Sequence, residues 1–231
     1  CALIGAIIWN LITWYFGIPS SSSHALIGGL IGSAFVKAGI DVVNTQGIIN
    51  KIIIPMILSP LIGFFIGYLV MLALLWMFHR VKPDKVNKYF KKLQLVSSAF
   101  MAFSHGSNDA QKTMGIITLA LVSFYSLKTF SVPIWVILLC AITMGLGTMV
   151  GGWRIIKTMG TKIFKMKPIH GFAGQTAASG IILSCSFLGI PISTTHVISS
   201  CILGVGSTQR FSAVKWGIAG NIIKAWIFTL P

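Results

Sequence analysis

The chain has 231 residues, of which 55% are hydrophobic and 9% are charged, whereas soluble domains average about 25% charged. Several apolar runs approach or exceed about 18 residues, the length of a membrane-crossing helix, so the sequence predicts an all-α polytopic membrane protein and excludes a soluble domain. The net charge of +15 comes from 18 Lys and Arg that gather in loops and at helix ends. That distribution is typical of cytoplasmic positive charge and argues against a nucleic-acid partner.

The first predicted helix covers residues 1–16 and is broken by Gly17-Ile18-Pro19. A polar cluster, Ser20 to His24, then precedes a second helix over residues 25–36. This order predicts a discontinuous membrane segment, which is tolerated only where protein or a wet cavity satisfies the freed backbone groups. Serine is also a favoured N-cap, so plain capping is the alternative. Four serines exceed what one cap needs, and we therefore expect a ligand-binding role for Ser21, Ser22 and Ser23.

A polar loop over residues 39–50 leads to a long apolar helix over 52–78. The segment 79–92 carries six Lys and Arg against a single Asp84. Such a basic linker is expected to lie in the cytoplasm.

The central polar patch, residues 104–112, lies between the apolar runs 93–103 and 113–125. It holds Asp109, one of three acids in the chain. An ionisable group in hydrocarbon is costly and indicates binding or transport by default. We expect the patch to separate two half-helices, the second beginning at Ser107 and Asn108. The alternative makes Asn108 and Asp109 only a helix cap.

Residues 132–150 form the next predicted span, and 153–167 form a second basic segment that should also face the cytoplasm. The chain must then cross the membrane an even number of times between the two basic segments, so 93–125 should cross once and not fold back. A helix over 170–188, rich in small residues, is suited to close packing. It is broken by Gly189-Ile190-Pro191, and apolar helices then run to Val205 and to Leu230.

An internal repeat relates the two breaks: GIPSSSSHALIGGLIG at 17–32 matches GIPISTTHVISSCILG at 189–204, an offset of 172 residues. The charge pattern places the following loops on opposite sides, so the repeat is predicted to be inverted, as in many secondary transporters with broken helices near the midplane. The predicted division is 1–78 as part of the first repeat, 79–92 as the cytoplasmic linker and 93–231 as the second repeat. Subtracting 172 from Asp109 gives a position before residue 1. We therefore expect a fragment lacking both ends, with a second Asn-Asp motif upstream.

These motifs resemble the inorganic phosphate transporter (PiT) family, most closely its bacterial branch. The resemblance rests on SHGSNDAQK, the paired GIPSSSSH and GIPISTTH, and GTMVGGWRIIKTMG. It implies symport of inorganic phosphate with Na⁺ or H⁺ across a bacterial inner membrane. Where many relatives have Glu in the pattern G-F-x-x-E, this chain has Gln175, which cannot ionise but can coordinate or donate through its amide.

The predicted site combines helix N-termini, hydroxyls and one carboxylate. The expected phosphate ligands are Ser21, Ser22, Ser23, Ser107, Asn108, Asp109, Ser193, Thr194 and Thr195. The expected ligands of the coupling cation are Asp109, Asn108 and Gln175. His24, His196 and Lys112 are further candidates: the histidines could instead bridge structural groups, and Lys112 could pair with Asp109 or reach toward water.

We expect no enzymatic activity, no cofactor and no metal apart from Na⁺. The expected partners are phosphate and the lipid bilayer, and the sequence leaves the formation of a homo-oligomer as an open alternative. Two other readings compete. A membrane-embedded hydrolase would use Ser, His and Asp of the central patch, but the chain has no G-x-S-x-G elbow. A channel or structural subunit would show no saturable, cation-dependent uptake.

Overall fold

The computed structural model describes residues 1–126 and 129–230, apart from the side chain of Lys162, and all regular structure in that part is helical. The main helices are α1 (Ala2–Tyr15), α2 (Ser22–Ala38), α3 (Thr45–Ile48), α4 (Ile54–Met77), α5 (Pro83–Tyr125), α6 (Ile134–Gly151), α7 (Trp153–Lys157), α8 (Pro168–Phe187), α9 (Thr194–Ser207) and α10 (Trp216–Thr229). Four short helical segments complete it: the 3-10 helices η1 (Ile40–Val42) and η4 (Phe211–Ala213), and the π-helices η2 (Ile49–Ile53) and η3 (Thr158–Lys162). The all-α prediction is confirmed.

Two helices of the described part are long and apolar enough to cross a membrane. One runs without interruption over Thr45–Met77, and the other is α6. Their mean hydropathies are 2.3 and 2.1.

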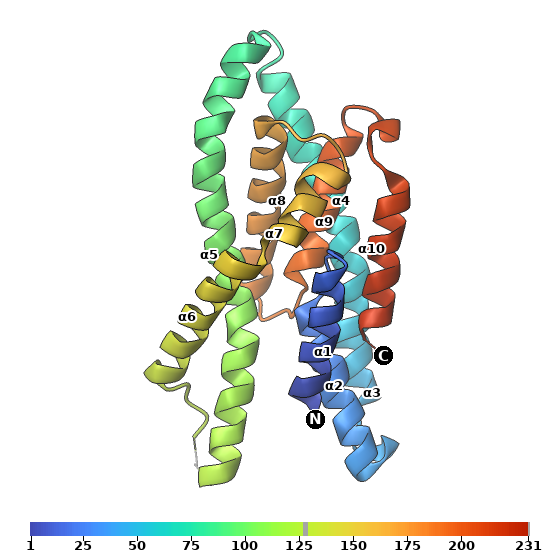
Figure 1. Cartoon of the computed structure of the whole chain (residues 1–231), viewed down its shortest axis with the longest axis vertical. Helices are drawn as coiled ribbons and strands as arrows, with labels where there is room; N and C mark the ends of the chain where they lie inside the picture. Colours follow the sequence, from blue (N-terminus) through green and yellow to red (C-terminus); the bar gives the residue numbers. More distant parts are fainter. Residues whose placement is uncertain (127–128, 231) are drawn as a thin grey trace.

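Both predicted breaks exist, and each one turns the chain back on itself as a hairpin. α1 packs against α2, and α8 packs against α9. Figure 1 shows the α1–α2 hairpin and the α8–α9 hairpin running in opposite directions, with their tips near the middle of the molecule. The inverted arrangement is therefore confirmed, whereas helices continuing straight through each break are not found.

The two tips have the same local geometry because the repeat supplies the same residues. Gly17 and Gly189 both have φ of +66°, a left-handed conformation that glycine adopts without a steric penalty. Ser21 and Ser193 are extended N-caps, and their hydroxyl oxygens accept hydrogen bonds from the backbone N–H of His24 and His196 at 3.2 and 3.3 Å. Capping, the alternative reading for serine, thus holds for one serine of each tip.

The predicted break in the central patch is wrong, because α5 is one continuous helix of 43 residues. No proline lies between residues 104 and 112, and the patch hydroxyls bond within the helix. Ser104 donates to the Phe100 carbonyl at 2.8 Å, and Ser107 donates to the Ser104 carbonyl at 3.2 Å. Ser107 and Asn108 therefore begin no half-helix, although the predicted single passage of 93–125 agrees with a straight rod.

The core of the molecule is built around α9, which packs against α4 and α8. Glycines permit this close approach: a Cβ on Gly204 would collide with the Phe64 backbone of α4, and one on Gly63 would collide with the Ser200 hydroxyl of α9. Small residues at helix contacts are typical of membrane proteins.

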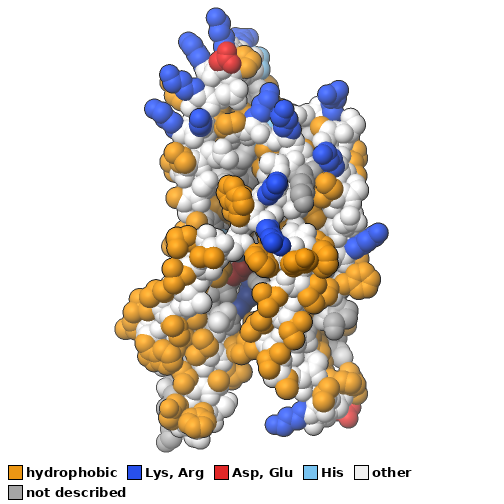
Figure 2. Space-filling model, in the orientation of Figure 1, with side chains coloured by type: hydrophobic (Ala, Val, Ile, Leu, Met, Phe, Trp, Pro, Cys, Tyr) orange, Lys and Arg blue, Asp and Glu red, His pale blue; other side chains and the backbone are white. Residues whose placement is uncertain are grey.

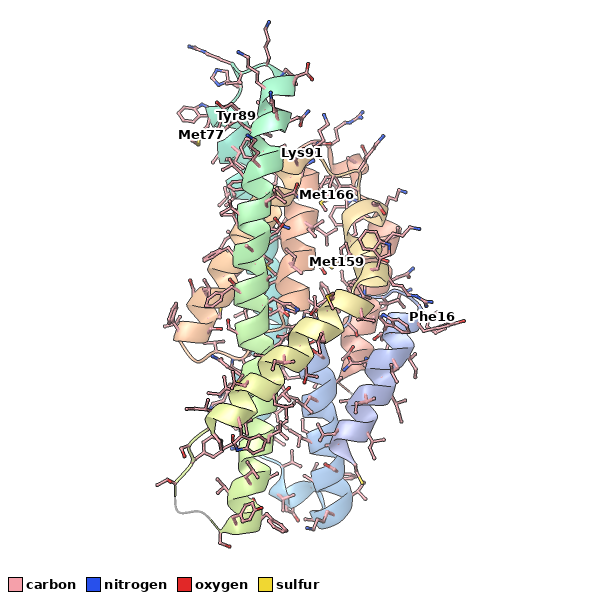
Figure 3. The ribbon with its side chains drawn as sticks, turned by 60° about the vertical axis from the view of Figure 1, so that its left-hand side comes forward. Phe16, Met77, Tyr89, Lys91, Met159 and Met166 are labelled. Carbon is pink, nitrogen blue, oxygen red and sulfur yellow. The ribbon has the colours of Figure 1, made fainter. Side chains whose placement is uncertain are left out.

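Basic side chains are concentrated toward one end of the long axis. Figure 2 shows most Lys and Arg in the upper half of this face, hydrophobic side chains covering much of the lower half, and charged side chains again at the lower end. Tyr89 and Lys91 mark the upper end in Figure 3, near the junction of α4 and α5. Phe16, at the end of α1, points outward and is 66% exposed.

Candidate functional site

A ladder of polar contacts fixes the register between α5 and α8. Ser97 and Ser98 donate to the Gln175 amide oxygen at 2.7 and 3.2 Å. Further along, the Ser186 hydroxyl donates to the Asn108 side-chain oxygen at 3.3 Å. The ladder brings the Asn108–Asp109 pair to the level of the α8–α9 tip.

Asp109 contacts the second tip directly. The Thr194 hydroxyl, at the first residue of α9, lies 3.1 Å from one carboxylate oxygen and 3.3 Å from the other. The Asn108 amide donates to the same carboxylate at 3.1 Å, and the His105 ring nitrogen Nδ1 lies 3.5 Å from it. The side chain is 11% exposed. Asp109 is thus a nearly buried carboxylate held by three polar neighbours.

Lys112 joins both tips to α5. Its ammonium group donates to the Ser23 hydroxyl of the first tip at 2.7 Å and to the Ile192 carbonyl of the second tip at 2.9 Å. It also lies 3.5 Å from the Asp109 carboxylate. Pairing with Asp109, one of the two alternatives for Lys112, is therefore what the structure shows.

A cavity of about 260 Å³ opens beside these contacts. Both tips, α1, α5 and α6 contribute to its wall, with Ser20, Ser22, Thr195, Asp109 and His105 among the polar lining residues. Since a water in the liquid takes about 30 Å³, the cavity has room for a small oxyanion. In Figure 2 an acidic and a basic side chain lie deep between the hydrophobic halves of this face.

The hydroxyls of the tips divide into three kinds. Ser21 and Ser193 are buried caps, while Ser23 and Thr194 bond Lys112 and Asp109. Ser22 is exposed and Thr195 is half-buried, and both line the cavity. Ser22 and Thr195 are thus the hydroxyls placed to meet a ligand.

Two predicted ligands are not brought to this point. Gln175 bonds Ser97 and Ser98, which precede Asp109 by eleven or twelve residues on α5, a separation of about 17 Å along a helix axis. The Ser107 hydroxyl donates to the backbone of its own helix. Asn108 and Asp109 therefore lie together without Gln175.

The two histidines face each other and not the cavity. Their ring centroids are 4.8 Å apart, edge to face, and His196 stacks on Trp226 at 4.1 Å. The Trp226 ring N–H donates to the Pro19 carbonyl at 3.1 Å. His24 and His196 are buried, which fits a structural bridge between the hairpins better than direct contact with a ligand.

Sequence reasoning missed Asn10, Ser186 and the Ile192 carbonyl. Asn10, on α1, lines the cavity and two neighbouring hollows. It is the one amide in the apolar run 1–16, and this exception was a readable signal. The role of the Ile192 carbonyl depends on the fold and carries no signal in the sequence.

The arrangement suits an anion together with a cation. α2 and α9 both begin at the tips, and helix N-termini offer free N–H groups and the positive end of the dipole. Asp109 adds the opposite charge. The site can therefore hold a small anion on hydroxyls and amides, beside a carboxylate that attracts a cation or a proton.

The known proteins that this chain resembles are described as phosphate transporters. The family described as "Phosphate transporter family" matches residues 1–231. The chain is 49% identical over 231 residues to a "Probable low-affinity inorganic phosphate transporter" of Rhizobium meliloti (strain 1021), covering 100% of this chain and 69% of that protein. A protein of the same description from Bacillus subtilis (strain 168) is 48% identical over 232 residues, again covering 100% and 69%. A solved structure titled "The sodium-dependent phosphate transporter" superposes with a TM-score of 0.88 at 26% identity, covering 100% of this chain and 74% of that one.

Proposed function

Because the chain belongs to the phosphate transporter family, we propose that it carries inorganic phosphate through the membrane by symport with Na⁺ or H⁺. Its relatives are transporters and not enzymes, and bacterial members among them agree with a multi-pass protein of a bacterial inner membrane. The division into 1–78, 79–92 and 93–231 stays a proposal, with 79–92 on the cytoplasmic side.

One observation carries the proposal: both hairpin tips meet the same charged pair on α5. Thr194 of the second tip contacts Asp109, and Ser23 of the first tip contacts Lys112. A site shared by two repeat halves can open to either side when one half moves against the other, which is how inverted-repeat transporters alternate.

Phosphate would be held mainly by Ser22 and Thr195, which face the cavity, and by backbone N–H groups at the starts of α2 and α9. Ser21 and Ser193 would keep those N–H groups in place as caps, and Ser23 and Thr194 would tie the tips to α5. Asn108 would orient Asp109. Ser107 and Gln175 would act on helix packing instead.

Asp109 would provide the coupling. A carboxylate beside a phosphate site repels the anion unless a cation or proton is bound as well. Binding of each ion would then lower the electrostatic cost of binding the other, so that neither ion crosses the membrane alone.

The test is radiolabelled phosphate uptake by the intact protein in proteoliposomes, under separately imposed Na⁺ and H⁺ gradients. Asp109→Asn should abolish gradient-driven uptake, while Asp84→Asn, at the far end of α5, should leave it unchanged. Full gradient-driven uptake by Asp109→Asn would remove the proposed role of the carboxylate. Absence of saturable uptake by the natural protein under either gradient would instead favour a channel or structural subunit.

The hydrolase alternative finds little support in the geometry. His105 lies near Asp109, but the neighbouring Ser104 hydroxyl donates to the Phe100 carbonyl within its own helix. A nucleophilic serine needs a base that accepts its proton.

A further inference from the structure

The ammonium group of Lys112 lies in a cage of oxygen atoms. The Ser23 hydroxyl is 2.7 Å away, the Ile192 carbonyl 2.9 Å and the nearer Asp109 carboxylate oxygen 3.5 Å. One oxygen comes from each hairpin tip and one from α5. The Lys112 side chain is 21% exposed.

Carbonyls of unwound segments hold Na⁺ at broken helices in transporters, and carboxylate oxygens suit hard cations in the same way. Here the same kinds of ligand surround a cation that belongs to the chain. A lysine ammonium is a compact point charge with three donors, so it can replace a small cation while bonding several oxygens.

We propose that Lys112 is a tethered counter-cation that fills a Na⁺-like position between the tips, so that phosphate transport by this chain needs no Na⁺ there. This inference rests on the proposed function and concerns its coupling ion. It also separates this chain from the sodium-dependent protein whose fold it shares.

The charge balance at the tips supports this assignment. The sequence has three acids, and Asp41 and Asp84 lie in η1 and in the first turn of α5, away from the tips. Asp109 is therefore the one acid beside the cavity, and Lys112 already matches its charge. In the site without phosphate, a Na⁺ ion at the same place would set two cations against one carboxylate.

Two charged or titratable side chains contact the Asp109 carboxylate in the described part of the chain, His105 at 3.5 Å and Lys112 at 3.5 Å, and both belong to α5.

The experiment compares the natural protein with Lys112→Asn, which removes the ammonium and offers an amide oxygen in its place. The intact proteins are reconstituted, and radiolabelled phosphate uptake is measured with an inward H⁺ gradient, with and without Na⁺. The natural protein should take up phosphate equally with Na⁺ or choline. Lys112→Asn should lose about tenfold or more of its H⁺-driven uptake, because bonds from a charged donor are lost, and Na⁺ should restore part of it.

A second measurement covers the case in which the variant is inactive. The melting temperature of each purified protein is compared in NaCl and in choline chloride. Na⁺ should stabilise Lys112→Asn and leave the natural protein unchanged. Lys224→Asn, a lysine on the exposed side of α10, is the matched control and should behave as the natural protein.

The outcomes are distinct. Strict dependence of natural uptake on Na⁺, or Na⁺ stabilisation of the natural protein with none in Lys112→Asn, would overturn the inference and leave phosphate symport standing. No phosphate uptake by the natural protein under either gradient would overturn the proposed function itself.

Discussion

The two hairpin tips share a sequence pattern and a cap geometry, but they lie in different surroundings. Eleven of the 14 residues of α9 are buried, whereas α2 buries three of 17, all in its first turn. Both caps, Ser21 and Ser193, are buried, and both tips reach α5. The comparison teaches that the repeated motif determines the tip itself, while the packing around each helix determines how far burial continues beyond it.

The difference also appears in what each tip bonds. The second tip reaches Asp109 through Thr194 and Lys112 through the Ile192 carbonyl, whereas the first tip reaches Lys112 through Ser23. In the repeat, Ser22 corresponds to Thr194 and Ser23 to Thr195. The tips are therefore alike in backbone and differ in their bonds to α5, and three pairs of substitutions and one single substitution can break or sharpen this contrast.

The largest difference in unfolding free energy is expected between substitutions at Gly204 and Gly32, which are equivalent in the repeat. A Cβ at Gly204 meets the Phe64 backbone, so Gly204→Ala should cost about 3 kcal/mol of unfolding free energy. At Gly32 a Cβ meets nothing within 4 Å in the described part, so Gly32→Ala should be neutral or stabilise by up to about 1 kcal/mol. Thermal unfolding in detergent measures both, and equal effects would contradict the contrast in packing.

The next difference concerns the equivalent hydroxyls Thr194 and Ser22. Thr194→Val removes a bond to a charged group and should cost about 2 kcal/mol, with a loss of uptake. Ser22→Ala should leave the melting temperature unchanged and raise the KM for phosphate, because Ser22 faces the cavity. The pair is compared by thermal unfolding and by uptake kinetics. An unchanged KM for Ser22→Ala would exclude the serine as a ligand.

The caps should behave alike. Ser21→Ala and Ser193→Ala each remove one cap bond, and each should cost about 1 kcal/mol. Ser33→Ala is a control, because its hydroxyl bonds the Leu30 carbonyl on an exposed part of α2. Thermal unfolding that separated the two cap variants widely would show that the tips are not equivalent even in their first turn.

The smallest effect is expected at His196. Its two ring nitrogens are buried without a hydrogen-bond partner among the described residues, and its ring stacks on Trp226. His196→Phe keeps the stacking and removes two unbonded polar atoms, so it should change stability by less than about 1 kcal/mol, in the stabilising direction. Unfolding and uptake are measured together. A large loss of phosphate affinity at unchanged stability would restore His196 as a ligand.

Much of the fold could be predicted because its signals are local. Gly-Ile-Pro followed by hydroxyls marks each break, and the match at an offset of 172 residues relates the two breaks. Apolar runs give the helices between them. The inverted orientation of the two repeat copies followed from the distribution of Lys and Arg, whereas their hairpin form did not.

The errors have a common physical cause. A polar patch in an apolar run can be a break between two helices or a polar stripe on an intact helix, and the amino-acid sequence of the patch is the same in both cases. In α5 the serine hydroxyls bond carbonyls three or four residues earlier, so the helix continues. Gln175 lies on the correct face of α8 but at the wrong height, because the register between α5 and α8 is a tertiary property.

Arg154 places a positive charge at the carboxyl end of α1, beside the turn of the first hairpin. Its guanidinium donates to the Tyr15 carbonyl at 2.9 Å and lies over the ring of Trp14 at 4.7 Å. A cation there compensates the negative carboxyl end of α1, while the positive amino end of α2, across the same turn, keeps its field. The amino end of α2 is therefore the dipole end that dominates the potential at this turn, and it favours an anion there.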